Sequence, residues 1–213
     1  MYENFNNLSI EKQKKIIYAS LEEFSENGYK KGSTNNIVRK AEISKGLLFH
    51  YFKSKKNLYI YLVDYVINFF INDIFKKAEL DIYMEENIFE RIKKWTLIKI
   101  KFFSKYRLEY NFLAKAMLTV PKELEDEINH RYKKIKYDGI EKLLKDIDTS
   151  MFRKDIDKDK GVELIINSLD GISNKYIKKY QGHGGELLDN VDIILEDINE
   201  YIDILKWGLY KRN

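Results

Sequence analysis

Apolar residues recur at intervals of three to four along most of the chain, which is the period of an amphipathic α-helix. The first such run begins after Ser9, a residue type that caps helices, and ends at Asn27–Gly28, a typical stop signal. A second run begins after Ser33 or Thr34. The pattern therefore predicts one long helix followed by a shorter one.

A third helix is predicted over Lys45–Tyr51, after the tight connection Glu42–Ser44. Two short helices separated by about three residues are typical of a helix-turn-helix. Ser54 can cap a fourth helix, in which an apolar stripe runs from Leu58 to Phe69. We expect this fourth helix to connect the N-terminal part to the rest of the chain.

Helical periodicity continues beyond residue 80. It predicts helices over Ile88–Lys105, Leu108–Leu118, Pro121–Ile147, Lys160–Gln181 and Glu186–Leu209. The glycine-rich segment 181–185 is expected to be the loop between the last two of them. The predicted fold is all-α with about nine helices, divided into an N-terminal three-helix domain over residues 1–54 and a larger helical domain over residues 55–213.

Composition supports long helices and excludes several classes of protein. The chain has 213 residues with 1 Pro, 10 Gly and no Cys, and 44% of its residues are hydrophobic. Without cysteine there are no disulfides, thiolate zinc sites or cysteine nucleophiles. The most apolar long segment, residues 59–75, contains Asp64, Asn68, Asn72 and Asp73, so no membrane span is predicted. The N-terminus lacks the pattern of a signal peptide, and we expect a cytoplasmic protein.

Basic charge is concentrated near the predicted helix-turn-helix. Residues 28–57 contain eight Lys or Arg and one acid, Glu42, a balance of +7, whereas the whole chain carries +4. Such a cluster is typical of a surface that contacts phosphates, although a merely solvated surface would have the same composition.

The segment Lys45–Tyr51 has the properties of a helix that enters a DNA groove. Ser44 can cap it, which leaves backbone N–H groups and the positive end of the helix available to a phosphate. Lys45, Leu47 and His50 are expected to point outward. The apolar Leu48, Phe49 and Phe52 are expected to pack against neighbouring helices.

The stretch from Ser33 to Leu58 resembles the N-terminal domain of TetR-family transcriptional regulators. The resemblance is carried by Ser33-Thr34-x-x-Ile37, then Ala41-x-Ile43-Ser44-Lys45-Gly46-Leu47-Leu48-Phe49-His50-Tyr51-Phe52-x-x-Lys55-x-x-Leu58. It implies a homodimer that binds a palindromic operator in double-stranded DNA and releases it when a small-molecule effector occupies the C-terminal domain. By position, the residues implied at DNA bases or backbone are Ser33, Thr34, Ser44, Lys45, Gly46, Leu47, His50, Tyr51 and Lys55.

Two residues depart from the family pattern. The family usually has glycine where this chain has Glu42, and a left-handed Glu would cost roughly 1 kcal/mol. The sequence leaves the geometry of this turn open. Leu47 replaces a small hydroxyl residue, so we expect an apolar contact there, for example to a thymine methyl group.

Dimerisation and effector binding are assigned to the C-terminal helices. The last two helices carry apolar stripes that could each be buried inside the subunit. Apolar residues beyond a single face of the last helix favour a partner, and we expect a four-helix interface between two subunits, formed by Ile165, Leu169, Ile172, Tyr176, Leu195, Ile198, Ile202 and Leu205. Aromatic residues in the middle helices are candidates to line a pocket for a lipophilic or planar effector: Trp95, Phe102, Phe103, Tyr106, Tyr110, Phe112 and Tyr132. Such residues also serve as ordinary core.

Other functions have weaker support in the sequence. No serine–histidine–acid spacing, metal set or phosphate loop favours an enzyme with an aromatic cavity, so we expect no catalysis. The acidic run after Asp155 lacks the glycine and the bidentate Glu of a calcium loop, and neither a metal nor a cofactor is expected. A helical adaptor whose basic patch meets a membrane or an acidic protein is a further alternative. It would bind duplexes without preference among sequences.

Overall fold

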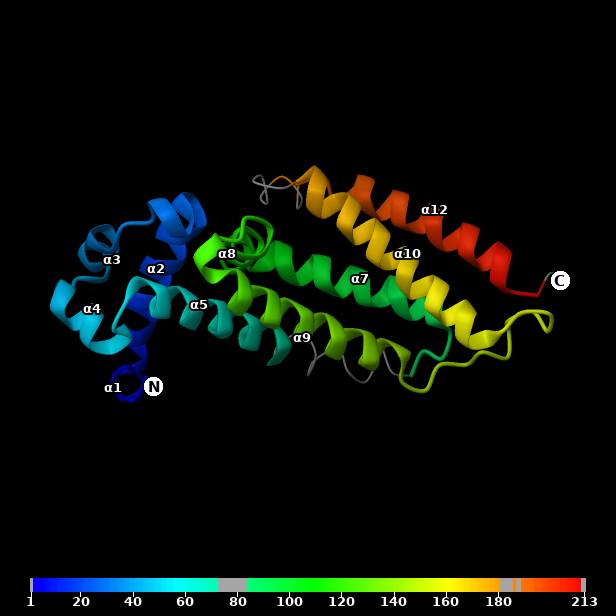
Figure 1. The fold of residues 1–213 in the computed structure, drawn as a ribbon, viewed down its shortest axis with the longest axis horizontal. Coiled ribbons are helices and arrows are strands. Elements are labelled where there is room, and N and C mark those ends of the chain that lie inside the picture. The colour runs from blue at the N-terminus through cyan, green and yellow to red at the C-terminus, as the bar shows by residue number, and fades with distance from the viewer. Residues whose placement is uncertain (1, 73–83, 181–185, 187–188, 212–213) are drawn as a thin grey trace. The chain divides into compact units, whose positions relative to one another are not determined.

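The structure is a computed structural model that describes residues 2–72, 84–180, 186 and 189–211. Within these ranges it contains ten α-helices, one 3₁₀-helix and no strand, apart from an isolated bridge between Phe152 and Tyr210. The all-α prediction is therefore confirmed (Figure 1). None of the described helices combines the length and the hydrophobicity needed to cross a bilayer.

Serine side chains set the starts of the N-terminal helices. The bounds are α1 Glu3–Asn6, α2 Ile10–Lys31, α3 Thr34–Ala41, α4 Lys45–Phe52 and α5 Lys55–Phe70. Ser9, Ser33, Ser44 and Ser54 each accept a hydrogen bond from the backbone N–H three residues later, which satisfies one of the unpaired donors of each helix. The predicted caps Ser9, Ser44 and Ser54 are confirmed, and of the two candidates Ser33 and Thr34 it is Ser33 that caps α3. Helix α1 was not predicted.

Packing divides the chain into two compact units. Unit 1 comprises residues 1–72 and 106–132, and unit 2 comprises residues 73–105 and 133–213. Unit 1 therefore adds to the N-terminal helices α8 (Arg107–Leu118), the 3₁₀-helix Lys122–Leu124 and the first two turns of α9 (Glu125–Leu144). This division differs from the boundary at residue 54 because α8 packs on α2 and α5.

The core of unit 1 is aromatic. The buried ring of Tyr59 lies 5.0 Å from Phe24 of α2 and 5.3 Å from Phe112 of α8, centroid to centroid. An ion pair adds a second connection, since Arg131 Nη2 of α9 donates to Asp64 Oδ2 of α5 at 2.8 Å. These contacts join segments that lie far apart in the sequence into one body.

Unit 2 contains α7 (Ile88–Lys105), the rest of α9, α10 (Lys158–Lys179) and α12 (Val191–Leu209). Its core is formed by Ile88, Phe89, Ile92, Phe152, Ile165, Ile202 and Leu209. The fully buried Arg91 donates to the carbonyls of Glu85 at 2.6 Å and Leu143 at 3.1 Å, so it satisfies a backbone acceptor at the end of α9. Helices α10 and α12 pack together (Figure 1).

Several boundaries differ from the predicted ones. Pro121 precedes a 3₁₀-helix, and α9 begins at Glu125 and ends at Leu144, well before Ile147. The final helix begins at Val191, five residues after Glu186. The loop predicted over residues 181–185 lies outside the described residues.

Candidate nucleic-acid interface

Helix α4 presents two different faces. Leu48 and Phe52 are each 1% exposed and form part of the unit 1 core, whereas Lys45, Leu47 and His50 are exposed, as expected from the pattern. The hydroxyl of Ser44 accepts the N–H of Leu47 at 3.2 Å, so the first turn is formed without a ligand. A short capped helix with one exposed face of mixed chemistry has the form needed to enter a major groove.

Gly46 lies in the first turn of α4. A Cβ atom built on it would have a single neighbour within 4 Å, the Ser44 hydroxyl at 3.9 Å. Packing inside the chain therefore does not require glycine here. The missing side chain leaves room on the outer face for close approach of another molecule.

Glu42 adopts the left-handed conformation, with φ 54° and ψ 43°, in the turn between α3 and α4. The question that the sequence left open is thereby settled: this turn has the geometry that favours glycine, with Glu in place. Lys15 of α2 forms an ion pair with the Glu42 carboxylate. The acidic charge beside α4 is therefore neutralised by a neighbouring cation.

The start of α3 is held by a carboxylate that sequence reasoning missed. Glu23 is 3% exposed, and its Oε1 accepts the backbone N–H of Ser33 at 2.8 Å and the side-chain amide of Asn27 at 3.1 Å. Ser33 in turn caps α3. No local pattern identifies Glu23, because its partner Ser33 lies ten residues away. The predicted contact residue Thr34 follows as the first helical residue and is half-buried.

Tyr51 and Lys55 have partners inside the chain. The Tyr51 ring lies edge-on to Phe5, 6.0 Å between centroids. Lys55 Nζ donates to the carbonyl of Lys30 at 3.2 Å and lies 5.0 Å from the centre of the Tyr29 ring. Burial lowers the pKa of Lys55. Contact between Lys55 and a phosphate would require this amine to leave the end of α2, and that role stays a prediction.

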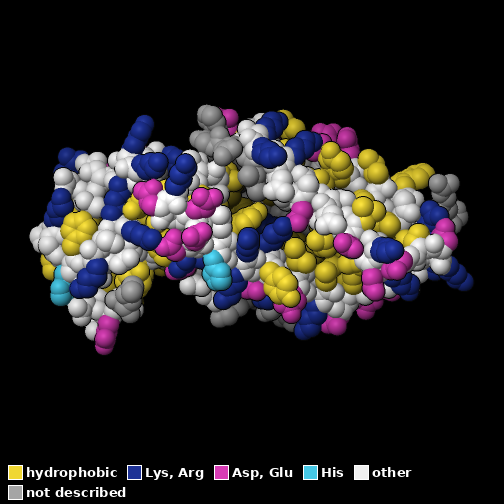
Figure 2. Space-filling model, viewed as in Figure 1, with side chains coloured by type: hydrophobic (Ala, Val, Ile, Leu, Met, Phe, Trp, Pro, Cys, Tyr) yellow, Lys and Arg dark blue, Asp and Glu magenta, His cyan; other side chains and the backbone are white. Residues whose placement is uncertain are grey.

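Intramolecular ion pairs neutralise part of the positive charge of the basic cluster in residues 28–57. Lys40 pairs with Glu22, and Lys56 pairs with Glu127. Lys30, Lys31 and Lys45 are exposed and form no ion pair with the described part of the chain. Figure 2 shows Lys and Arg side chains spread over the surface of the N-terminal helices.

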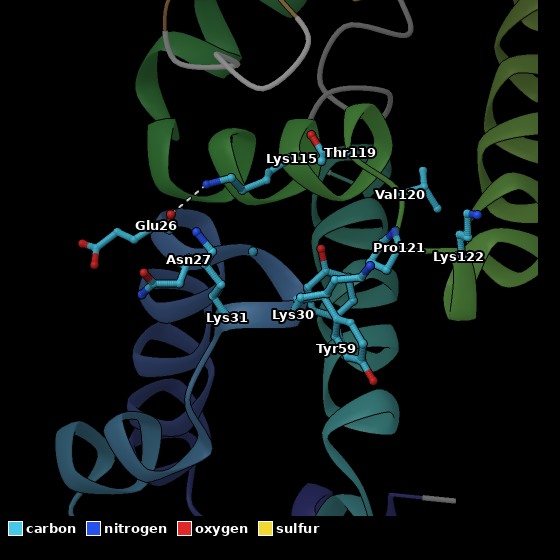
Figure 3. Close-up of a pocket in the computed structure, with 12 residues that line it drawn as sticks. Glu26, Asn27, Lys30, Lys31, Tyr59, Lys115, Thr119, Val120, Pro121 and Lys122 are labelled. Carbon is cyan, nitrogen blue, oxygen red and sulfur yellow. Dashed lines mark hydrogen bonds between the residues drawn. The ribbon is translucent and has the colours of Figure 1, made fainter.

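Unit 1 has grooves lined by described residues beside α4 and at the end of α2. One, of about 450 Å³, lies beside α4 and is lined partly by Lys12, Lys15, Ser44, Leu47 and Tyr51, together with Glu11 and Glu42. The other, of about 460 Å³, lies at the end of α2, and the residues that line it include Lys30, Lys31, Lys115, Lys122, Tyr59 and Pro121 (Figure 3). Neither groove contains the predicted effector residues.

The predicted effector residues are distributed between both units. Trp95, Phe102 and Phe103 lie half-buried on α7 in unit 2, whereas Tyr106, Tyr110, Phe112 and Tyr132 belong to unit 1. Phe112 is fully buried against Tyr59 and is a core residue of unit 1. On α7, burial lowers the pKa of Lys99 to about 8, and its amine lies 5.4 Å from the centre of the Trp95 ring.

The side chains predicted for the dimer interface are largely covered by other residues of the same chain. Ile165, Ile172, Tyr176 and Ile202 are buried within unit 2, and Leu169, Leu195, Ile198 and Leu205 are half-buried. The hydroxyl of Tyr176 donates to Asp197 Oδ2 at 2.7 Å, and this bond joins α10 to α12. Other apolar residues on the same helices are exposed: Leu164, Ile193, Tyr201, Ile204 and Trp207.

The arrangement offers polar groups for recognition of an anion or a base edge. No group of three or more His, Asp or Glu side chains in the described ranges is placed to bind a metal ion.

Comparison with known proteins agrees with this arrangement. The family model of bacterial regulatory proteins of the tetR family matches residues 16–62, and that of the tetracyclin repressor-like C-terminal domain matches residues 86–210. No protein with a curated description matches the chain.

Solved structures share the fold. A TetR family transcriptional regulator from Chloroflexus aurantiacus J-10-FL is 24% identical with a TM-score of 0.54, over 99% of this chain and 98% of that one. A TetR-like transcriptional regulator from Rhodococcus sp. RHA1 is 18% identical with a TM-score of 0.59, over 92% and 93%. The fatty acid degradation regulator FadR from Bacillus halodurans is 18% identical with a TM-score of 0.55, over 85% and 97%.

The two family models together span the helix-turn-helix and most of the C-terminal helices, and the C-terminal model alone covers more than half of the chain. The chain therefore belongs to the tetR family of bacterial regulatory proteins.

Proposed function

We propose that this protein is a cytoplasmic repressor that binds a palindromic operator as a homodimer and releases it when a small lipophilic or aromatic effector binds. The observation that carries the proposal is the two-faced helix α4: Leu48 and Phe52 fix it in the core, while Lys45, Leu47 and His50 remain exposed. Lys45 and His50 supply donors for base edges, and Leu47 supplies an apolar contact. The proposed role is regulatory, without catalysis.

The proposed mechanism is a balance between two states of the dimer. Two copies of α4 must lie about 34 Å apart to enter successive major grooves on one side of the duplex. An effector that binds more tightly to a dimer with a different distance between the two α4 helices lowers the affinity for the operator. The operator then lowers the affinity for the effector by the same factor. Half-buried aromatic residues on α7 favour a lipophilic effector, and the relative from Bacillus halodurans with the same fold is a fatty acid degradation regulator.

The proposal is tested by selecting bound duplexes from a random pool and measuring affinity for the selected sequence. We expect a palindromic consensus. Lys45→Ala should weaken binding about tenfold and change the preferred bases. Tyr51→Phe removes only the hydroxyl, which is expected to contact a phosphate, so it should weaken binding to all duplexes by a similar factor. Lys154→Ala, which removes an exposed lysine from unit 2, is the matched control and should bind like the wild type.

A pool without a consensus would count against operator recognition. Equal affinities of the Lys45→Ala and Lys154→Ala variants would exclude α4 as the reading helix. The effector is sought by thermal shift with a panel of fatty acids, acyl thioesters and planar aromatic compounds. A compound that binds with equal affinity in the presence and absence of operator is not an inducer.

A further inference from the structure

Helix α1 lies outside the region matched by the tetR-family model, which begins at residue 16. It is nevertheless fixed to the helix-turn-helix. Phe5 is fully buried, with ring centroids 4.8 Å from Phe52 of α4 and 5.3 Å from Tyr61 of α5. The hydroxyl of Tyr2 donates to the carbonyl of Asn57 at 3.2 Å.

A hydrogen-bonded connection to α2 fixes the other end of α1. The side-chain amide of Gln13 donates to the carbonyls of Asn6 at 3.0 Å and Leu8 at 2.8 Å. Helix α1 is therefore held from both sides, and its exposed face has a defined position beside α4.

On that exposed face, Asn4 Nδ2 lies 3.0 Å from Nε2 of His50. An amide nitrogen can only donate, so Nε2 of the ring must accept. A neutral imidazole that accepts at Nε2 carries its proton on Nδ1. Lys53 does not compete for the ring, because its amine donates to the His50 backbone carbonyl at 2.9 Å. The Tyr51 ring lies edge-on, 5.7 Å from the imidazole centroid.

We propose that Asn4 is a positioning residue for DNA recognition: it holds His50 in the Nδ1–H tautomer, so that the ring presents a donor to DNA. This inference rests on the proposed function, since it gives His50 a base or phosphate to read. A donor at Nδ1 suits acceptors in the major groove, such as N7 and O6 of guanine, or a phosphate oxygen. It does not suit the amino group of cytosine. Through Asn4, helix α1 thereby determines to which base edges His50 can donate.

The first test reads the tautomer in the full-length protein without DNA, by NMR of the ring nitrogens at a pH where histidine is neutral. His50→Gln assigns the His50 signals, since the chain also contains His130 and His183. We expect the Nδ1–H form of His50 to dominate in the wild type and to lose population in Asn4→Ala. Asn4→Asp, which offers only acceptors, should shift the proton to Nε2.

Asn6→Ala on the same helix is the matched control and should leave the tautomer unchanged, because no side-chain contact of Asn6 holds the ring. Melting curves verify that all variants fold. An identical tautomer ratio in the wild type and in Asn4→Ala would overturn the proposal.

The second test is a double-mutant cycle on the selected duplex. Asn4→Ala should weaken binding about fivefold, the effect of losing one positioned hydrogen bond. In the His50→Ala background the same substitution should have no effect. A loss that persists without His50 would mean that Asn4 acts on DNA directly or through the fold, and the positioning role would be wrong. If the wild type binds no duplex, the proposed function fails, while the NMR measurement still decides whether Asn4 sets the ring.

Discussion

At the scale of single residues, Glu42 combines an unfavourable backbone with a favourable side chain. Its left-handed conformation costs about 1 kcal/mol relative to glycine. Its ion pair with Lys15 is exposed and contributes about 0–1 kcal/mol. The backbone cost is therefore at least as large as the contribution of the ion pair, so stability alone does not explain why Glu stands here. The pair does remove one positive charge from the groove beside α4.

We therefore expect Glu42→Gly to raise the free energy of unfolding by up to about 1 kcal/mol, because relief of the backbone outweighs loss of the pair. It should also strengthen duplex binding and steepen its salt dependence, since Lys15 becomes available to a phosphate. Urea denaturation and binding at several salt concentrations provide the measurements. Glu42→Gln separates the two causes: it releases Lys15 but keeps the strained backbone. Unchanged DNA affinity in both variants would exclude an electrostatic role for Glu42.

At the scale of elements, helix α2 is interrupted near its C-terminal end, and a residue of α8 binds the carbonyls at the interruption. Gly28 has φ 65° and ψ −178°, a conformation almost restricted to glycine, and it interrupts the helix. The carbonyls of Ser25 and Glu26, just before the break, accept hydrogen bonds from the amine of Lys115 of α8, at 2.9 and 2.8 Å. Figure 3 shows the bond to Glu26. Lys115 therefore caps α2 from a position about ninety residues later in the chain.

Gly28→Ala should lower the free energy of unfolding by about 1–3 kcal/mol through backbone strain alone. A steric clash is not the cause, because the nearest atom to an added Cβ is Lys115 Cδ at 3.9 Å. Gly139→Ala is the control: this glycine lies within α9 with no atom within 4 Å of an added Cβ, so alanine should stabilise by about 0.5–1 kcal/mol. Equal effects in urea denaturation would show that the break does not depend on glycine.

At the scale of the whole molecule, the last two helices have more apolar surface than one chain buries. The apolar stripes predicted for the interface mostly form the unit 2 core. A second set of apolar side chains on the same two helices remains exposed, including Ile204 at 68% and Trp207 at 73%. Figure 2 shows hydrophobic side chains gathered on unit 2. Exposed large apolar residues at this density are typical of a protein interface.

We expect the double variant Ile204→Asp, Trp207→Glu to be monomeric, because charges at an apolar interface lose their hydration without gaining partners. Sedimentation measures the change in mass. Operator affinity should fall at least 100-fold, since a monomer contacts one half-site. Tyr137→Asp, which alters an equally exposed residue on α9, is the control. A double variant that remains dimeric would place the interface elsewhere.

The features that could be predicted from the sequence are those that depend on residues close together in the chain. The caps at Ser9, Ser33, Ser44 and Ser54 were predictable because a cap involves residues three apart. The short helix α1 was missed because four residues have no helical period, and Phe5 becomes informative only beside Phe52. Apolar spacing predicts the interface residues only as members of a buried face, because it does not indicate whether the chain itself or a partner covers that face.

The sequence by itself determined the helical class, the helix starts and the motif between Ser33 and Leu58, because each depends on neighbours within one or two turns. Tertiary structure alone decided the left-handed Glu42 with its partner Lys15, the Glu23 bond to Ser33, the Lys115 cap and the Asn4–His50 pair. These are single polar contacts between distant segments. The energy of each contact changes when the donor–acceptor distance changes by a few tenths of an ångström, and the periodicity of the sequence does not indicate that distance.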